Sequence, residues 1–159
     1  MKKIMLSLSV IFLLVSCQED IKFNNPALQG VKDNVFWRST QSKATLSGDG
    51  SLLIKGYTST ETVSLKTAST KVQTYILGTG VTNKASYEHK EGTTTTTFST
   101  AGGIGNGEIV ITEYDVVTKT VSGTFKFNAE NSDKNSAAGT NLNFQQGVFY
   151  KVPVSPSAQ

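Results

Sequence analysis

The chain has 159 residues, with 15 Lys and Arg against 12 Asp and Glu, and a formal net charge of +3. No run of Lys or Arg exceeds two residues, which excludes the concentrated basic surface of a nucleic-acid-binding domain. The single Cys excludes an internal disulfide, and the length accommodates one domain. We therefore expect one domain that folds on its own core and has no nucleic-acid partner.

Residues 1–16 have the layout of a secretory signal peptide. Lys2 and Lys3 form a positive start, and residues 4–15 are an uncharged apolar run. This run has twelve residues, whereas a membrane-spanning helix needs about 20. We therefore expect residues 1–16 to be cleaved from the protein rather than to remain as a transmembrane segment.

The apolar run ends in Leu14-Val15-Ser16-Cys17, which resembles the bacterial lipobox. The resemblance implies that the sulfur of Cys17 receives a diacylglyceryl group, that cleavage precedes Cys17, and that the new amino group receives an acyl chain such as palmitate. Several acyl chains on one residue would suffice to anchor the protein, because stable membrane anchoring needs more than one hydrophobic chain. The alternative interpretation makes Cys17 a buried thiol or an ordinary residue of the signal peptide.

Gln18, Glu19 and Asp20 follow the predicted lipid-attachment site. They resemble the acidic export signal of surface lipoproteins in Bacteroidetes-type bacteria. The alternative is a solvated acidic start to a linker. Residues 17–32 show no sustained period, so they predict a tether, with a short docked piece at residues 27–31.

The rest of the chain is rich in Thr, Ser, Gly, Asn and Val, which favours strands joined by tight turns. We expect an all-β domain over residues 33–154, followed by a flexible tail at 155–159. The expected strands are residues 35–37, 44–46, 51–57, 61–67, 74–77, 83–90, 93–100, 107–114, 121–128 and 142–152.

Alternation of apolar and polar residues is clearest near the end of the chain. One face carries Val121, Gly123, Phe125 and Phe127. The other face carries the polar residues between them, Ser122, Thr124, Lys126 and Asn128. In the last strand, all the even-numbered positions named here are apolar, so we expect them on one inward face: Leu142, Phe144, Val148, Tyr150 and Val152. Nine or ten strands without a helical window predict an antiparallel β-sandwich or a flattened, incompletely closed barrel.

Several stretches of the chain resemble an uncharacterised lipoprotein family of Bacteroidetes-type bacteria. The resemblance covers nearly the whole chain after the signal peptide. It implies a lipid-anchored β domain at the outer membrane, with a domain of unknown function and no assigned catalytic residues. The stretches are Asn25-Pro26-Ala27-Leu28-Gln29, residues 50–56, 61–65, 75–78, 107–115 and 120–129, and Gly147-Val148-Phe149.

Three sequence features carry weak signals for a catalytic or ion-binding site. His89 is the only His, so a zinc site or a Ser-His-Asp hydrolase lacks partners, and we expect an exposed His near a strand end. The glycine-rich segment 101–107 precedes a strand rather than a helix, which favours a flexible connection over a phosphate site. Asn131, Asp133 and Asn135 have the spacing of calcium ligands, but Leu142 occupies the position of the bidentate Glu. We expect a polar loop there.

Two further sets of residues have alternative readings. The five threonines at residues 93–97 predict an exposed edge strand, although a flat hydroxyl ladder also binds ice or sugars. Trp37, Tyr57, Tyr75, Tyr87 and Tyr150 are able to line a ligand cleft, but we expect Trp37 to close one end of the core.

The sequence thus predicts a non-enzymatic lipoprotein of the outer membrane, exposed on the cell surface and without a cofactor or metal. Its partners are the membrane, through the lipid on Cys17, and an extracellular protein or glycan. The alternative is a carrier of a small apolar ligand in an open, lipocalin-like barrel. A hydrolase that depends on His89 is a third reading.

Overall fold

The computed structural model describes residues 27–157, so Cys17, Gln18, Glu19 and Asp20 lie outside the described part of the chain. The described residues form eleven strands and no helix. No helix among them is long and apolar enough to cross a membrane. The strands are β1 (Ala27–Lys32), β2 (Val35–Arg38), β3 (Gln41–Leu46), β4 (Leu52–Tyr57), β5 (Glu61–Thr67), β6 (Thr74–Leu77), β7 (Lys84–Glu91), β8 (Thr94–Ser99), β9 (Asn106–Asp115), β10 (Thr120–Asn131) and β11 (Asn141–Pro156).

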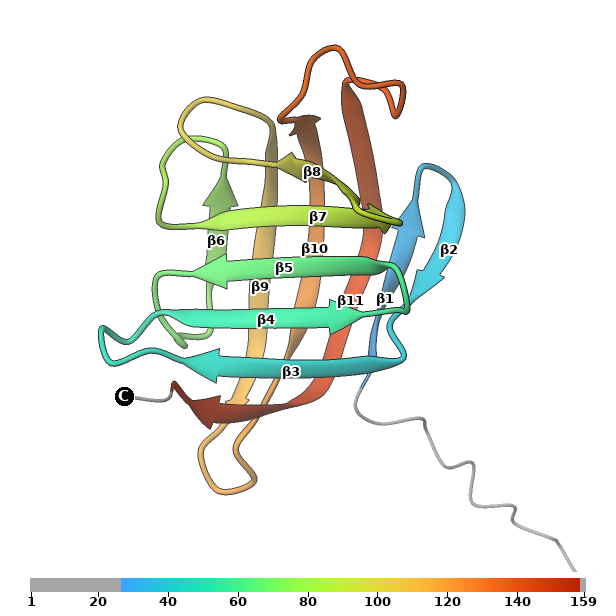
Figure 1. Cartoon of the computed structure of the whole chain (residues 1–159). Helices are drawn as coiled ribbons and strands as arrows, with labels where there is room; N and C mark the ends of the chain where they lie inside the picture. The colour runs from blue at the N-terminus through green and yellow to red at the C-terminus, as the bar shows by residue number, and fades with distance from the viewer. Residues whose placement is uncertain (1–26, 158–159) are drawn as a thin grey trace, which may run out of the picture.

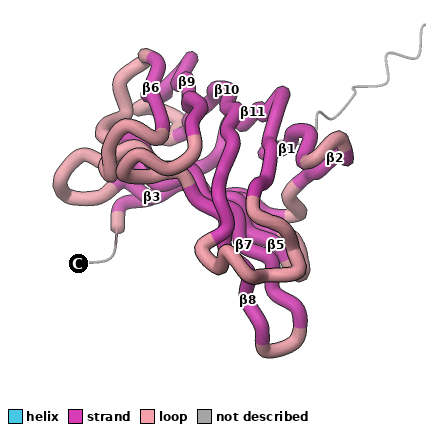
Figure 2. The backbone as a smooth tube through the Cα atoms, turned by 90° about the horizontal axis from the view of Figure 1, so that it is seen from above, coloured by secondary structure: helices cyan, strands magenta, loops and turns pink. Residues whose placement is uncertain are grey.

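The strands form two layers that are joined by hydrogen bonds. One layer has the order β2-β1-β11-β10-β9-β6, and the other has the order β3-β4-β5-β7-β8. Figure 1 shows the second layer in front, with its strands running across those of the first, and Figure 2 shows the two layers from above. The end of β11 pairs with β3 in parallel, and β10 pairs with β8. These links confirm a sandwich that resembles a flattened, incompletely closed barrel.

The space between the layers is filled by apolar side chains, among which aromatic rings form the centre. The Phe144 ring lies 5.2 Å from Phe125, 5.5 Å from Phe127 and 5.6 Å from Trp37, measured between centroids. Phe125 and Phe127 face inward as the alternation predicts, and the core position of Trp37 is confirmed. Close ring packing of this kind gives a filled interior.

The last strand does not keep the single parity that its sequence predicts. Gln146 and Lys151 both have positive φ, at 51° and 48°, and each shifts the inward face of β11 by one residue. Phe149 is therefore buried, whereas Val148 and Tyr150 face outward and are partly exposed. The prediction that Val148 and Tyr150 face inward is wrong, because β-bulges reset the alternation.

Three other expectations also differ from the structure. Ser122, expected on the outer face of β10, is buried at a register shift, and its Oγ accepts a hydrogen bond of 3.1 Å from the backbone N–H of Lys151. The sheet begins at Ala27, inside the predicted tether, because β1 pairs with both β2 and β11. It ends at Pro156, inside the predicted tail, since residues 154–156 pair with β3. With β1, the described residues form eleven strands, close to the nine or ten that the sequence predicts.

Candidate functional site

Glu61 lies at the start of β5, where a short turn fixes the backbone. The Oγ1 of Thr58 accepts hydrogen bonds from the backbone N–H groups of Glu61 and Thr60, at 2.9 and 3.4 Å. The backbone N–H of Thr58 donates to the Glu61 carbonyl at 2.9 Å. Threonine side chains commonly form such turns. Because Glu61 shares its parity with the buried Val63, the turn directs a carboxylate toward the space between the layers.

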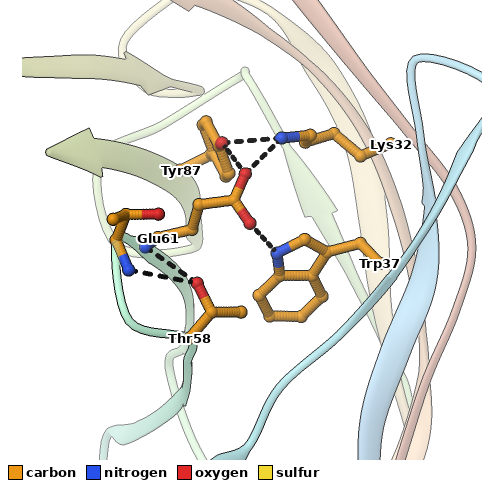
Figure 3. A network of polar contacts seen from close by, with 6 residues as sticks. Lys32, Trp37, Thr58, Glu61 and Tyr87 are labelled. Carbon is orange, nitrogen blue, oxygen red and sulfur yellow. Dashed lines mark hydrogen bonds and ion pairs between the residues drawn. The ribbon is translucent and has the colours of Figure 1, made fainter. Parts of the chain in front are cut away.

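Three side chains from three other strands converge on the Glu61 carboxylate (Figure 3). Lys32 Nζ and the Tyr87 hydroxyl both donate to Oε1, and Trp37 Nε1 donates to Oε2 at 2.6 Å. Lys32 Nζ also donates to the Tyr87 hydroxyl at 2.7 Å. Lys32 and Trp37 come from the back layer, whereas Glu61 and Tyr87 come from the front layer. The network therefore joins the two layers at one side of the sandwich.

The β1–β2 turn positions the two residues from the back layer. Asp33 and Asn34 both have positive φ, at 46° and 67°, which a tight two-residue hairpin turn requires. The turn pairs Trp37 with Gly30, and a Cβ on Gly30 would lie 2.5 Å from the Phe144 ring. Only glycine at this position lets β1 approach the aromatic core and brings Lys32 to its rim.

The network is partly buried, and its surroundings set the ionisation of Glu61. The side chains of Lys32 and Glu61 retain 22% and 18% of their exposure. Burial raises the pKa of the Glu61 carboxyl. The hydrogen bonds from Lys32, Tyr87 and Trp37 and the charge of Lys32 together lower this pKa by more than burial raises it, so the pKa falls below its ordinary value. Burial and the Glu61 carboxylate raise the pKa of the Tyr87 hydroxyl.

These directions favour the ionised form of Glu61 and the protonated form of Tyr87. A general acid or base works best when its pKa lies near the working pH, and the Glu61 pKa moves away from neutrality. Both of its oxygens already accept hydrogen bonds from the fold itself. Glu61 therefore acts as a fixed anion that holds two strands of each layer together.

A small open pocket lies beside the network, with a volume of about 170 Å³. It lies where the β1–β2 turn, the β7–β8 hairpin and the segment before β11 meet. Six of its nine lining residues have polar side chains. The lining residues are Lys32, Asp33, Tyr87, His89, Thr96, Phe98, Ala138, Asn141 and Leu142.

The size and lining of the pocket limit what it accepts. At roughly 30 Å³ per water, it holds about five or six waters, and it is smaller than the roughly 300 Å³ at which pockets for drug-sized ligands begin. Lys32 offers three N–H donors, of which Glu61 and Tyr87 use two. Such a site suits one polar ring or one chain end, such as a single sugar unit.

Among the sequence candidates, His89 and the threonine run adjoin this pocket. His89 is half-buried near the end of β7, and it lines the pocket together with Thr96. No group of three His, Cys, Asp or Glu able to hold a metal is found within residues 27–157. Thr94 and Thr95 are exposed on β8 and pair with β7 on one side, as an edge position predicts.

The two loop candidates serve the fold. Asn131 is buried, its Nδ2 donates to the Gly139 carbonyl at 2.7 Å, and its Oδ1 accepts from the Asp133 N–H at 3.0 Å. Asp133 in turn accepts from the Asn135 N–H at 2.9 Å. These oxygens close the loop before β11, as expected for a polar loop. The glycine-rich segment leads into β9, a strand, as the sequence predicts.

Sequence reasoning missed Lys32 and Glu61 as a pair. Each has the parity of buried neighbours, since Lys32 follows Leu28 and Gly30, and Glu61 precedes Val63. A charge on the inward face of a strand end signals a buried partner. The signal does not name the partner, because 29 residues separate Lys32 from Glu61.

Comparison with known proteins identifies the family to which the chain belongs. A family model described as "Domain of unknown function (DUF6252)" matches residues 24–153, a range that includes Lys32, Trp37, Glu61 and Tyr87. Neither the curated proteins nor the solved structures gave a significant match. The matched range covers most of the 159 residues, so the chain belongs to the DUF6252 family.

Proposed function

We propose that the protein is a lipoprotein of the outer membrane, anchored through Cys17 and exposed on the cell surface. Its β domain binds an extracellular protein or glycan and performs no catalysis. Gln18, Glu19 and Asp20 direct its export. The pocket beside Glu61 is the candidate contact for the partner.

The observation that carries this proposal is the position of the pocket relative to the start of the sheet. β1 begins at Ala27, inside the predicted tether, and ends at Lys32, which lines the pocket. Six strand residues span about 20 Å. The N-terminal connection and the pocket therefore lie at opposite ends of β1, so a domain held at its N-terminus presents the pocket away from the membrane.

The aromatic packing between the layers supports a binding module over a carrier. A carrier needs interior volume for its ligand, but Phe144 packs against Trp37, Phe125 and Phe127 at the centre of the domain. The pocket of about 170 Å³ is polar and open rather than apolar and enclosed.

Protease treatment of intact cells tests the proposal. Wild-type protein is compared with a variant in which Gln18, Glu19 and Asp20 are all changed to Ala, and the β domain is followed by antibody. We expect degradation of wild type and protection of the variant. Protection of both would place the domain in the periplasm and contradict surface exposure.

Anchoring is tested separately by metabolic labelling with a palmitate analogue. We expect wild type to incorporate the label and the Cys17→Ser variant to lose it. Label in both proteins, or in neither, would contradict lipid attachment at Cys17.

A further inference from the structure

The turn between β9 and β10 carries two exposed apolar residues at its tip. Val116 and Val117 retain 71% and 87% of their exposure. Tight turns favour Gly, Asn, Asp and Ser, whereas β-branched apolar residues favour strands. Asp115 forms this turn, because its Oδ1 accepts hydrogen bonds from the N–H groups of Val117 and Thr118 at 2.8 and 3.0 Å. The turn is thus held by Asp115, and the two valine side chains are mostly exposed, although Val116 also lines a small pocket with Tyr114 and Val154.

The tip lies at the end of the domain where β1 begins. Ala27 pairs with Tyr150 of β11, and the next residue, Lys151, donates its backbone N–H to Ser122 of β10. From Ser122 the hairpin continues through Thr120 to the turn at residues 116–119, which adds about 10 Å along the strand direction. Figure 1 shows this hairpin as the lowest part of the coloured ribbon, below the start of β1.

The length of chain before β1 brings this end close to a membrane. Ten residue steps separate Cys17 from Ala27, and they span at most about 35 Å when fully extended. This reach exceeds the distance of about 10 Å by which the tip projects beyond Ala27. An anchor at Cys17 therefore permits the tip to touch the bilayer while Ala27 remains in water.

We propose that Val116 and Val117 insert into the surface of the bilayer that holds the lipid anchor, and so orient the domain with its pocket outward. This inference rests on the proposed function. Two valines bury less apolar surface than one acyl chain, which itself gives only marginal binding. The contact forms because the anchor makes it intramolecular, at a high effective concentration.

The charges around the tip fit a contact made by apolar side chains. Lys119 and Lys151 are exposed near the turn, and Glu113 and Asp115 lie beside them. Two positive and two negative groups leave no net charge to attract anionic lipids. We therefore expect the contact to persist when the salt concentration is raised.

Depth-dependent quenching in vesicles tests the contact. The full lipoprotein is extracted from membranes and reconstituted into vesicles of phosphatidylethanolamine and phosphatidylglycerol that contain bromine-labelled lipid. A fluorophore is attached to a Thr118→Cys variant at the tip, or to an Ala137→Cys variant in the loop before β11, at the opposite end. We expect quenching severalfold stronger at the tip than at residue 137, and unchanged by salt.

Matched variants assign the quenching to the valines. Val116→Ser with Val117→Ser, added to Thr118→Cys, is expected to reduce quenching to the level of residue 137. Val81→Ser with Ile104→Ser removes two other exposed apolar side chains, in loops at the opposite end, and is expected to leave it unchanged. Equal quenching at both label positions, or quenching that survives the Val116 and Val117 changes, would overturn the inference.

The same preparation reports on the anchor independently. Cys17 is the only native Cys, and its lipidated sulfur takes no thiol label, so an anchored protein carries one fluorophore per chain and also incorporates the palmitate label. Two fluorophores per chain would mean that Cys17 is free. The proposed anchor would then fail, and the inference with it. One fluorophore without quenching at the tip would refute the inference alone.

Discussion

Lys32, the last residue of β1, and Glu61, the first residue of β5, form an ion pair that joins the two layers of the domain. The Tyr87 hydroxyl and Trp37 Nε1 also donate to this carboxylate. Removing Glu61 would leave Trp37 Nε1 without this acceptor and Lys32 with only the Tyr87 hydroxyl. The pair thus couples the pocket lining, which includes Lys32 and Tyr87, to the stability of the domain.

Glu61→Ala is expected to lower the free energy of unfolding by about 2–4 kcal/mol, because it removes one acceptor from three donors. Urea denaturation monitored by Trp37 fluorescence measures the change, since Trp37 is the only Trp. The matched control is Glu88→Ala on the exposed face of β7, expected to change stability by less than about 0.5 kcal/mol. Equal losses of unfolding free energy in Glu61→Ala and Glu88→Ala would mean that the network does not stabilise the domain more than an exposed surface residue does.

The Glu61 carboxyl also gives a pH dependence with a definite sign. Its pKa in the folded protein lies below the ordinary value of 4.5, so the stability that it contributes is fully present above that value. As the pH falls through the folded pKa, this contribution is lost. We expect the stability difference between wild type and Glu61→Gln, measured by urea denaturation, to be largest near neutral pH and to shrink below 4.5. A difference that stays constant down to about pH 3 would contradict this assignment.

Gly123 lets β10 approach the aromatic core. A Cβ at this position would lie 2.0 Å from the Val110 carbonyl oxygen and 2.4 Å from Cζ of Phe149. Gly123→Ala is therefore expected to destabilise the domain by about 3 kcal/mol or more. Gly80→Ala is the control, because a Cβ there meets nothing within 4 Å. Similar midpoints for both variants in thermal unfolding would show that the structure at Gly123 relaxes easily.

Alternation identified the all-β fold but not the bulges. Phe125 and Phe127 face inward as predicted, because burial alternates without a break from Gly123 to Ala129. Val148 and Tyr150 face outward, against the prediction, because Gln146 adopts positive φ, which Gln does not favour; the second such residue, Lys151, returns Val152 to the inward face. For residues 27–31 the sequence predicts only a docked piece of the tether, because Gly30 and Pro26 are typical of a tether, whereas pairing with β11 makes the segment a strand.

The candidate site was only partly readable from the sequence. Tyr87 and Trp37 were recognised as aromatic candidates and His89 as the only imidazole, because their residue types are distinctive. Lys32 and Glu61 resemble ordinary surface charges unless the fold is known. Their contact joins residues 29 positions apart in different layers, and local patterns carry no information about such a pairing.

His89 provides a direct test of the pocket, because its imidazole is the only one in the chain and lines the site. An untagged protein therefore has one set of histidine side-chain NMR signals. We expect these signals to shift on titration with a sugar of a size that fits about 170 Å³, chosen from single hexoses, hexuronates and N-acetylhexosamines.

Ala138→Trp, which places a large ring at the pocket rim, is expected to abolish the shift. Folding should be retained, because Ala138 is exposed. Signals that do not move with any sugar would remove monosaccharide units as the pocket's ligand and favour a protein chain end. A shift that persists in Ala138→Trp would place the binding elsewhere.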